Sequence, residues 1–290
     1  MKFSLPGIIE FEDLNRFFLE KYRQSPDLFY AEAVIDSIYG SVPGLMWNGG
    51  RNSPVDKMAI TDVAKLMENY AKYDVKLRFT FTNCLLDDSL LCDEYSEELL
   101  AMIDNYRYEV TVCSQLLEDK IRREHPRIRL ISSTTKCLVS DEDIVNELNR
   151  DYYLVVLDFR RNDDLEFVAS LPHREKVEIL VNEDCYRECV QRGRHYQDIS
   201  QNILMHDQMP DTEQYCCGKY PTLYDSFAQA TTIRVEDLYG VYRSLGIDHA
   251  KLRGRRSEPF DVLESYVYYL IRPEQRDRVR LEALRAGVVS

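Results

Sequence analysis

The amino-acid sequence predicts an α/β protein built as a (β/α)8, or TIM-type, barrel. Short apolar segments of strand length, rich in β-branched residues, recur eight times along the 290 residues. Segments with the apolar spacing of helices separate most of them. Such alternation is typical of parallel strands joined by helical crossovers. Eight strands in a chain of this length favour a closed barrel over the runner-up, an open doubly wound sheet.

The predicted strands share a high content of Val, Ile, Leu, Phe and Tyr. In chain order they are residues 33–40, 75–83, 108–114, 127–134, 152–158, 177–182, 231–237 and 247–254. The spacing predicts a helix within 56–73, where the apolar stripe is Met58, Ile60, Val63, Leu66, Met67 and Tyr70. Leu116, Leu117 and Ile121 mark another helix. A third begins at Asp141, with acidic residues in its first turn, where the helix dipole favours them.

Additional helices are expected at both ends of the chain. An amphipathic segment, residues 11–23, precedes the first predicted strand and is expected to cover the bottom of the barrel. After the last strand, residues 260–271 and 273–284 are typical of two helices separated by a proline. No stretch has the composition of a flexible linker, so a single barrel domain over residues 1–290 is expected.

Composition excludes several classes of protein. The net charge of -13 argues against general DNA binding, which needs basic surface to neutralise phosphates. The sequence has no run of eighteen apolar residues, so no membrane span is predicted. The start, MKFSLPG, lacks the apolar region and cleavage site of a signal peptide. We therefore expect a cytoplasmic protein without membrane contact, whose eight cysteines stay reduced as thiols or metal ligands.

Active sites of such barrels lie at the carboxyl ends of the strands. Applied to the predicted strands, this rule selects polar residues and cysteines that follow each one. They are Tyr39 and the loop to Arg51, Asn83 and Cys84, Ser114, the run Ser133 to Lys136, Asp158, Asn182 with the cysteines after it, Glu236 and Asp237, and Lys251, Arg253 and Arg255.

Four cysteines in the second half of the chain are candidate metal ligands. Cys185 and Cys189 follow a predicted strand, and a helix beginning near Cys185 would place both thiols on one face. Cys216 and Cys217 follow in a loop rich in turn residues. Thiolates of this kind suit zinc or an iron–sulfur cluster. The alternative is that they are reduced thiols acting as small apolar residues, which is the preferred interpretation for Cys84, Cys113 and Cys137.

Basic residues near the predicted strand ends are candidate binding sites for an anionic substrate. Arginine binds carboxylate or phosphate as a two-pronged donor. The candidates are Arg51, Lys136, Arg192, Arg194, His195, Lys251 and Arg255. The alternatives are a solvated helix face for the arginines after Cys189, helix capping for the Ser-Thr-Lys run, and a structural Trp47 in the loop before Arg51.

Known catalytic motifs are missing from the sequence. It has no nucleophile elbow, no glycine-rich dinucleotide motif after a strand and no P-loop. Carboxylates at Asp158, Glu236 and Asp237 follow predicted strands, but their pairing in space cannot be predicted. No catalytic residue is identified.

Several stretches resemble the collagenase-like peptidase superfamily, peptidase family U32, and within it the barrel proteins of ubiquinone hydroxylation. One is the strand VEILVN running into Cys185, followed by a second cysteine, an Arg-rich stretch and Ser200. Another is GIDHAKLRGRRSEPFDVLESYVYYL, residues 246–270, with VEDLYGVYRSLGI before it. The opening MKFSLPG is similar to that of the smaller ubiquinone-pathway partner.

The resemblance implies a TIM-type barrel, a [4Fe–4S] cluster and oxygen-independent hydroxylation, or a related modification, of an organic or RNA substrate. It implies Cys185, Cys189 and Cys216 as ligands, with Cys217 or His195 as the fourth, and a second barrel protein as a partner. The sequence departs from the family pattern where Arg253 replaces a glutamate and where the first two cysteines are closely spaced. Without an activated nucleophile, peptidase activity is not supported. The alternatives are a metal-free or zinc-bearing barrel that serves as a binding or scaffold protein, and a carboxylate-based hydrolase.

Overall fold

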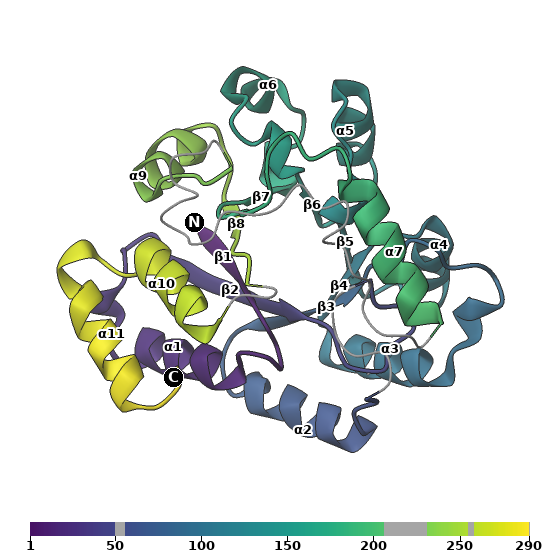
Figure 1. The fold of residues 1–290 in the computed structure, drawn as a ribbon, viewed down its shortest axis with the longest axis horizontal. Helices are drawn as coiled ribbons and strands as arrows, with labels where there is room; N and C mark the ends of the chain where they lie inside the picture. The colour runs from purple at the N-terminus through teal and green to yellow at the C-terminus, as the bar shows by residue number, and fades with distance from the viewer. Residues whose placement is uncertain (50–55, 206–230, 255–257, 290) are drawn as a thin grey trace. The chain divides into compact units, whose positions relative to one another are not determined.

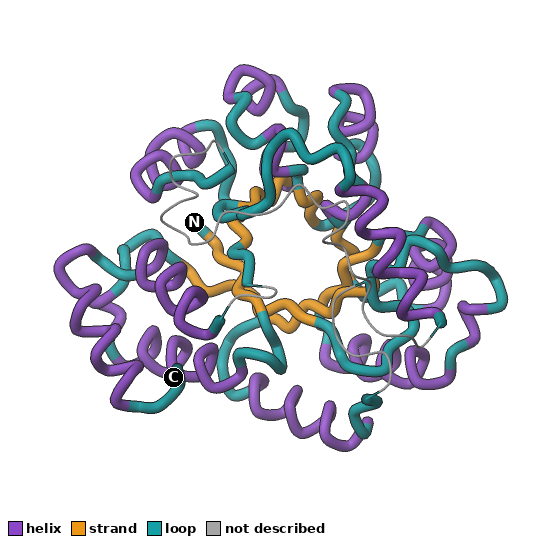
Figure 2. The backbone as a smooth tube through the Cα atoms, in the orientation of Figure 1, coloured by secondary structure: helices purple, strands orange, loops and turns teal. Residues whose placement is uncertain are grey.

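The computed structural model describes residues 1–49, 56–205, 231–254 and 258–289. Within these ranges, eight strands follow one another around a closed barrel in sequence order, drawn in orange in Figure 2. The pairs β1–β8, β7–β8, β3–β4, β4–β5 and β5–β6 are parallel. The expected α/β class and the closed eight-stranded barrel are therefore confirmed.

The strands are short, and helices separate most of them along the chain (Figure 1). The strands are β1 (Lys2–Pro6), β2 (Val34–Gly40), β3 (Lys76–Phe81), β4 (Glu109–Val112), β5 (Arg129–Ser132), β6 (Leu154–Val156), β7 (Val177–Leu180) and β8 (His249–Lys251). The α-helices are α1 (Glu12–Gln24), α2 (Ile60–Ala71), α3 (Glu94–Tyr106), α4 (Gln115–Glu124), α5 (Asp141–Leu148), α6 (Leu165–Ser170), α7 (Arg192–Leu204), α9 (Val235–Asp237), α10 (Pro259–Leu270) and α11 (Arg276–Arg285). Shorter turns are η1 (Pro26–Leu28), η2 (Leu90–Cys92), η3 (Thr134–Lys136), η4 (Phe159–Arg161), η5 (Arg174–Lys176), the π-helical η6 (Leu238–Tyr242) and η7 (Pro273–Gln275).

The chain divides into two compact units. The first unit comprises Met1–Ile38, Leu157–Glu188 and Gly218–Ser290, and the second comprises Tyr39–Val156 and Cys189–Cys217. The first unit therefore carries β1, β7 and β8, and the second carries β3, β4, β5 and β6.

In the second unit, strand residues alternate between an apolar face and a polar face, as the two-residue period of a strand requires. The apolar face of β3 includes Phe79, which contacts the ring of Tyr108, and the Tyr108 hydroxyl donates to Met67 of α2. The opposite face carries Arg78, whose Nε lies 3.2 Å from the Glu109 carboxylate across the β3–β4 pair. Both side chains of this ion pair are buried.

The first unit has the same arrangement. Along β1, Phe3 and Leu5 are fully buried and alternate with the buried polar residue Ser4. The register places Ser4 beside Lys251 of β8. Bulky branched side chains are typical of the interior of such barrels. Polar residues on one strand face of each unit are therefore a distinctive feature of this chain.

Two strand predictions were wrong. Residues 231–237 form an isolated antiparallel bridge, between Thr232 and Asn182, and then begin α9. The acidic residues Glu236 and Asp237 lie in the first turn of that helix, where the dipole favours them over an extended chain. The strand that was not predicted is β1, which has only five residues and ends in a proline, a residue that sequence patterns associate with turns.

Most helix predictions were confirmed, but the amphipathic segment 11–23 forms the connection from β1 to β2 and not a helix ahead of the first strand. α2 buries Val63, Leu66, Met67 and Tyr70, the expected stripe, and lies beside α3 (Figure 1). α5 begins at Asp141, with the Ser140 side chain accepting the N–H of Asp143 as its cap. At the carboxyl terminus, α10 and α11 are separated at Pro273. The amphipathic segment before β2 is α1.

Candidate functional site

The β7–α7 segment, residues 181–191, follows the carboxyl end of β7 and carries the first two predicted metal ligands. Cys185 is half-buried and Cys189 is buried, and neither forms a disulfide. Cys185 belongs to the first unit and Cys189 to the second. The expectation that a helix begins near Cys185 was wrong, because α7 begins only at Arg192. Instead, Glu183 accepts the N–H of Cys185 at 3.3 Å, a local bond that competes with helix formation.

Three charged residues, which we call the Arg253 clamp, connect this segment to the end of β8. They are Glu183, Asp184 and Arg253. The guanidinium of Arg253 donates to the Asp184 carboxylate, and its Nε lies 3.6 Å from Oε1 of Glu183. The same Glu183 oxygen accepts the N–H groups of Asp184 at 3.1 Å and Cys185 at 3.3 Å. One arginine therefore offsets two carboxylates directly before Cys185.

Asn182 strengthens this connection through its side chain. Its Oδ1 accepts the Arg253 N–H at 2.7 Å, and its Nδ2 donates to the Arg253 carbonyl at 3.3 Å. Nδ2 also lies 3.2 Å from the Ser265 hydroxyl of α10. The amide of Asn182 thus pairs with the chain after β8 as a neighbouring strand would, and places Glu183 beside the Arg253 guanidinium.

Lys251, a predicted substrate ligand, is the last residue of β8 and is buried. Its Nζ lies 4.0 Å from Oε2 of Glu178, which is also buried. A buried ammonium needs a compensating charge, and Glu178 supplies one. Binding of an anionic substrate by Lys251 stays a prediction.

The predicted ligands Arg192, Arg194 and His195 lie in the first turn of α7. Arg192 is buried, and its guanidinium lies 5.3 Å from the centre of the Tyr196 ring. Arg194 is exposed and lies 3.8 Å from Asp198 one turn later. His195 is half-buried beside Tyr196. The structure therefore brings these three residues together on one turn, with Arg194 on the solvent side.

Lys136, the remaining described basic candidate, is part of a polar network in the second unit. Its Nζ donates to Glu147 at 2.5 Å and to the Tyr152 hydroxyl at 2.7 Å. Burial raises the pKa of the Glu147 carboxyl, but hydrogen bonds from Lys136 and Ser132 outweigh this effect, so that its pKa is lowered overall. Lys136 therefore has a structural role in the β5–α5 connection. Its binding of a substrate stays a prediction.

Asn83 connects three segments at the carboxyl end of β3. Its Nδ2 donates to the carbonyls of Met46 and Ser200, and its N–H donates to the Trp47 carbonyl. Trp47 is fully buried, contacts the ring of Phe81 and donates its indole N–H to Leu90. The structural interpretation of Trp47 is therefore confirmed.

The remaining strand-end thiols of the second unit have polar neighbours. Cys84 Sγ lies 3.3 Å from the Ser200 hydroxyl of α7, and the same hydroxyl accepts the Cys84 N–H at 3.2 Å. Burial raises the pKa of the Cys113 thiol to about 11, and the nearby thiols of Cys84 and Cys137 also raise it. Because Cys113 stays protonated at neutral pH, its properties fit a reduced thiol better than a metal ligand.

The predicted carboxylates do not form a pair. Asp158 follows β6 and receives two hydrogen bonds from the Arg160 guanidinium, at 2.8 and 2.9 Å. Glu236 and Asp237 are exposed on α9. The described part of the chain thus gives these three residues no arrangement typical of a carboxylate-based hydrolase.

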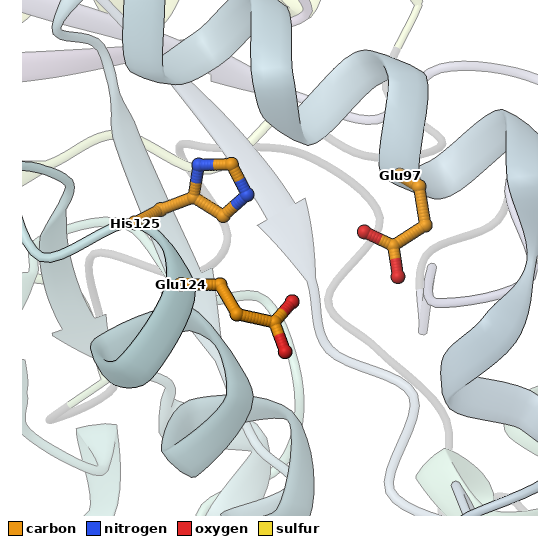
Figure 3. Close-up of side chains that lie close together, drawn as sticks. All are labelled: Glu97, Glu124 and His125. Atoms are coloured by element: carbon orange, nitrogen blue, oxygen red, sulfur yellow. The ribbon is translucent and has the colours of Figure 1, made fainter.

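Among the described residues, one group of three potential ligands comes close enough together to hold a metal ion, and it includes none of the predicted ligands. Figure 3 shows Glu97 of α3 with Glu124 and His125 at the end of α4, whose ligand atoms lie within 4.8 Å of one another. The ammonium of Lys120 lies 2.6 Å from Glu97 and 2.8 Å from Glu124. His125 Nδ1 lies 3.1 Å from Asp104. A lysine already occupies the position of a cation, so this group is an ion-pair cluster.

Four of the predicted site residues lie outside the described residues. They are the ligands Cys216 and Cys217 and the basic residues Arg51 and Arg255. Their roles stay predictions.

The partners within the Arg253 clamp were not predicted from the sequence. Arg253 and Asp184 are 69 positions apart, and Glu183 and Asp184 have the pattern of ordinary acidic loop residues. The available signal was the run Asn-Glu-Asp before Cys185 at a strand end, since adjacent carboxylates at a half-buried position need a cation. Glu178, the partner of Lys251, could have been found from its polar position within an apolar strand.

No helix of the described ranges combines the length and apolar character that crossing a bilayer requires.

Comparison with known proteins gives one similar solved structure. No protein-family model matches the chain, and no curated protein matches it. The structure described as "The Structure of the U32 Peptidase Mk0906" matches with a TM-score of 0.51 and 12% sequence identity, over 87% of this chain and 90% of that chain. At this identity the likeness shows the fold alone. The chain therefore shares its barrel fold with the structure of a U32 peptidase, the family that the sequence resembles.

Proposed function

We propose that this chain is a cytoplasmic barrel protein that binds an iron–sulfur cluster at the β7–α7 segment. Cys185 and Cys189, together with Cys216 and Cys217, would hold a [4Fe–4S] cluster. The activity would be oxygen-independent hydroxylation, or a related modification, of an anionic small molecule or an RNA. A second barrel protein would be its partner.

The observation that carries the proposal is the position of Cys185. It is a half-buried thiol outside any disulfide, a few residues beyond the carboxyl end of β7, where barrel active sites lie. Thiolates are the donors that iron–sulfur clusters require, and Cys189 supplies a second one from the same segment. When bound, the cluster would supply one-electron transfer. The chain's own residues would hold the ligands in place and orient the substrate.

Arg192 and Arg194 are the residues best suited to hold an anionic substrate. They lie on the first turn of α7, directly after the cysteine segment, and Arg194 reaches solvent. The positive end of the helix dipole at this turn also favours an anion. Proteolysis is not part of the proposal, because the likeness to a U32 peptidase extends to the fold alone.

The test is purification without oxygen of the wild type and of two variants, Cys185→Ser and Cys189→Ser. Cys92→Ser is the matched control, because Cys92 is an exposed free thiol in the described part of the chain. The wild type and the control are expected to be brown and to absorb broadly in the visible range, as thiolate-bound iron–sulfur clusters do. Both ligand variants are expected to lose this absorption. A colourless wild type with one zinc would indicate the zinc alternative, and a metal-free wild type would indicate a binding or scaffold protein.

A further inference from the structure

The segment that carries Cys185 has an unusual distribution of charge. Glu183 and Asp184 place two carboxylates directly before a residue that must be an anion to bind metal. Both carboxylates are largely shielded from water, with 9% and 20% of their side-chain surface exposed. Repulsion between such groups and a thiolate is screened little by solvent. Two carboxylates shielded from water in this way need a compensating cation beside them.

Arg253 meets this need from the end of β8. Its guanidinium contacts both carboxylates, and only 14% of its side-chain surface is exposed. Its own N–H and carbonyl are paired with the Asn182 side chain, so the arginine is held from its main chain as well. These contacts restrict movement of the guanidinium away from Glu183 and Asp184. The positive charge therefore stays beside the two carboxylates.

The backbone geometry at Cys185 depends on the same contact. The Glu183 oxygen that receives the N–H groups of Asp184 and Cys185 is the one nearest to Arg253 Nε. An arginine that orients this carboxylate thus orients the peptide groups on either side of Asp184. Residues that hold metal ligands indirectly in this way are general features of metal sites.

We propose that Arg253 is the positioning residue of the metal site. It offsets the charges of Glu183 and Asp184 and, through Glu183, fixes the backbone from which the Cys185 thiol reaches the metal. This inference rests on the proposed function, but the contact itself can be tested without metal.

The first test is amide hydrogen exchange over residues 181–188 in the metal-free protein. Arg253→Gln is expected to speed exchange at Asp184 and Cys185 about tenfold, the change that loss of one hydrogen bond produces. Arg280→Gln is the matched control, because Arg280 makes a two-pronged contact with Glu264, at 2.7 and 2.9 Å, in the same unit. Unchanged exchange in Arg253→Gln would overturn the proposal, whether or not the protein binds metal.

The second test is cobalt(II) titration of the metal-free protein, followed by thiolate-to-metal absorption. Arg253→Gln is expected to weaken binding about tenfold or more, as loss of an orienting residue does. Arg253→Lys is expected to recover part of the affinity, since it keeps the charge but not the two-pronged contact. Equal affinity in the wild type and Arg253→Gln would overturn the positioning role.

Two further outcomes separate this proposal from the proposed function. A wild type that binds neither iron nor cobalt would remove the metal site, and the hydrogen exchange would still decide whether Arg253 fixes the segment. If Arg253→Gln does not fold, Arg253→Lys replaces it in both tests, because it loses the two-pronged contact and keeps the charge. Because Asp184→Asn removes a carboxylate and leaves the arginine in place, it is expected to retain cobalt binding, and combining it with Arg253→Gln is expected to reduce the arginine variant's loss. A double variant as impaired as the single one would contradict the role in charge compensation.

Discussion

Asn182 and Arg253 are joined at both main-chain groups of Arg253, with the Asn182 side chain accepting at 2.7 Å and donating at 3.3 Å. The side-chain amide thereby continues the parallel pairing of β7 and β8 beyond the last strand residues. The Asn182 amide thus places residues 183–185 beside the Arg253 guanidinium, which offsets the charges of Glu183 and Asp184. The candidate metal segment is therefore attached to the barrel by hydrogen bonds that cross from one strand end to the next.

Asn182→Leu should destabilise the protein by about 1–3 kcal/mol per buried polar group left without its partner. The reason is that Leu is similar in size but cannot bond the N–H and carbonyl of Arg253. Urea unfolding measures the effect. Asn69→Leu serves as the control, because the Asn69 side chain accepts a hydrogen bond from the exposed Lys72 ammonium, and the change is expected to alter stability by less than about 0.5 kcal/mol. Equal effects of the two substitutions would contradict the role of Asn182.

Gly49→Ala should destabilise the connection between β2 and α2. A Cβ at this position would lie 2.0 Å from the Thr82 carbonyl oxygen, a backbone atom that cannot move aside independently. The expected cost is about 1–3 kcal/mol, typical of overpacking. Gly193→Ala is the matched control on α7, where the added Cβ meets no atom within 4 Å, and it is expected to stabilise the helix by up to about 1 kcal/mol. Thermal unfolding that ranks the two variants in the opposite order would refute this account.

Glu147 should make stability depend on pH in the acid range. Its pKa is lowered in the folded protein, so its contribution is fully present above the unfolded carboxyl pKa and is lost as the pH falls through the lower folded value. Glu147→Gln should therefore reduce stability at neutral pH and flatten the loss of stability on acidification. Urea unfolding between pH 3 and pH 7, a range that includes the unfolded Glu pKa of about 4.3, measures this. The exposed Glu142→Gln on the same helix is the control, and a parallel pH profile in both variants would exclude the role of Glu147.

Cys113 should react slowly with alkylating reagents. With a pKa of about 11, roughly one Cys113 thiol in a thousand is ionised at pH 8, which limits alkylation. Cys92 is exposed, and we expect it to react more than about tenfold faster with iodoacetamide. Thr135→Val should slow Cys113 further, because the Thr135 hydrogen bond lowers its pKa. Peptide mass spectrometry follows both sites, and faster reaction of Cys113 in the variant would run against this explanation.

The sequence predicted the barrel class and most of its elements because the apolar patterns of α2, α4 and α5 and of most strands are local. It failed at β1, which has only five residues and ends in a proline, and at α9, where β-branched residues precede an acidic helix turn. The Arg253 clamp depends on a contact between residues 69 positions apart, which no local pattern encodes. The position of Cys185 could be predicted, but the charges that surround it could not.

The most direct test of the central claim is the iron and acid-labile sulfide content of the chain purified without oxygen. The account predicts about four irons and four sulfides per wild-type chain, the composition of a [4Fe–4S] cluster, with neither retained in Cys185→Ser and both retained in Cys92→Ser. A wild type without iron, or a Cys185→Ser variant that keeps the full complement, would contradict the assignment of Cys185 as a cluster ligand.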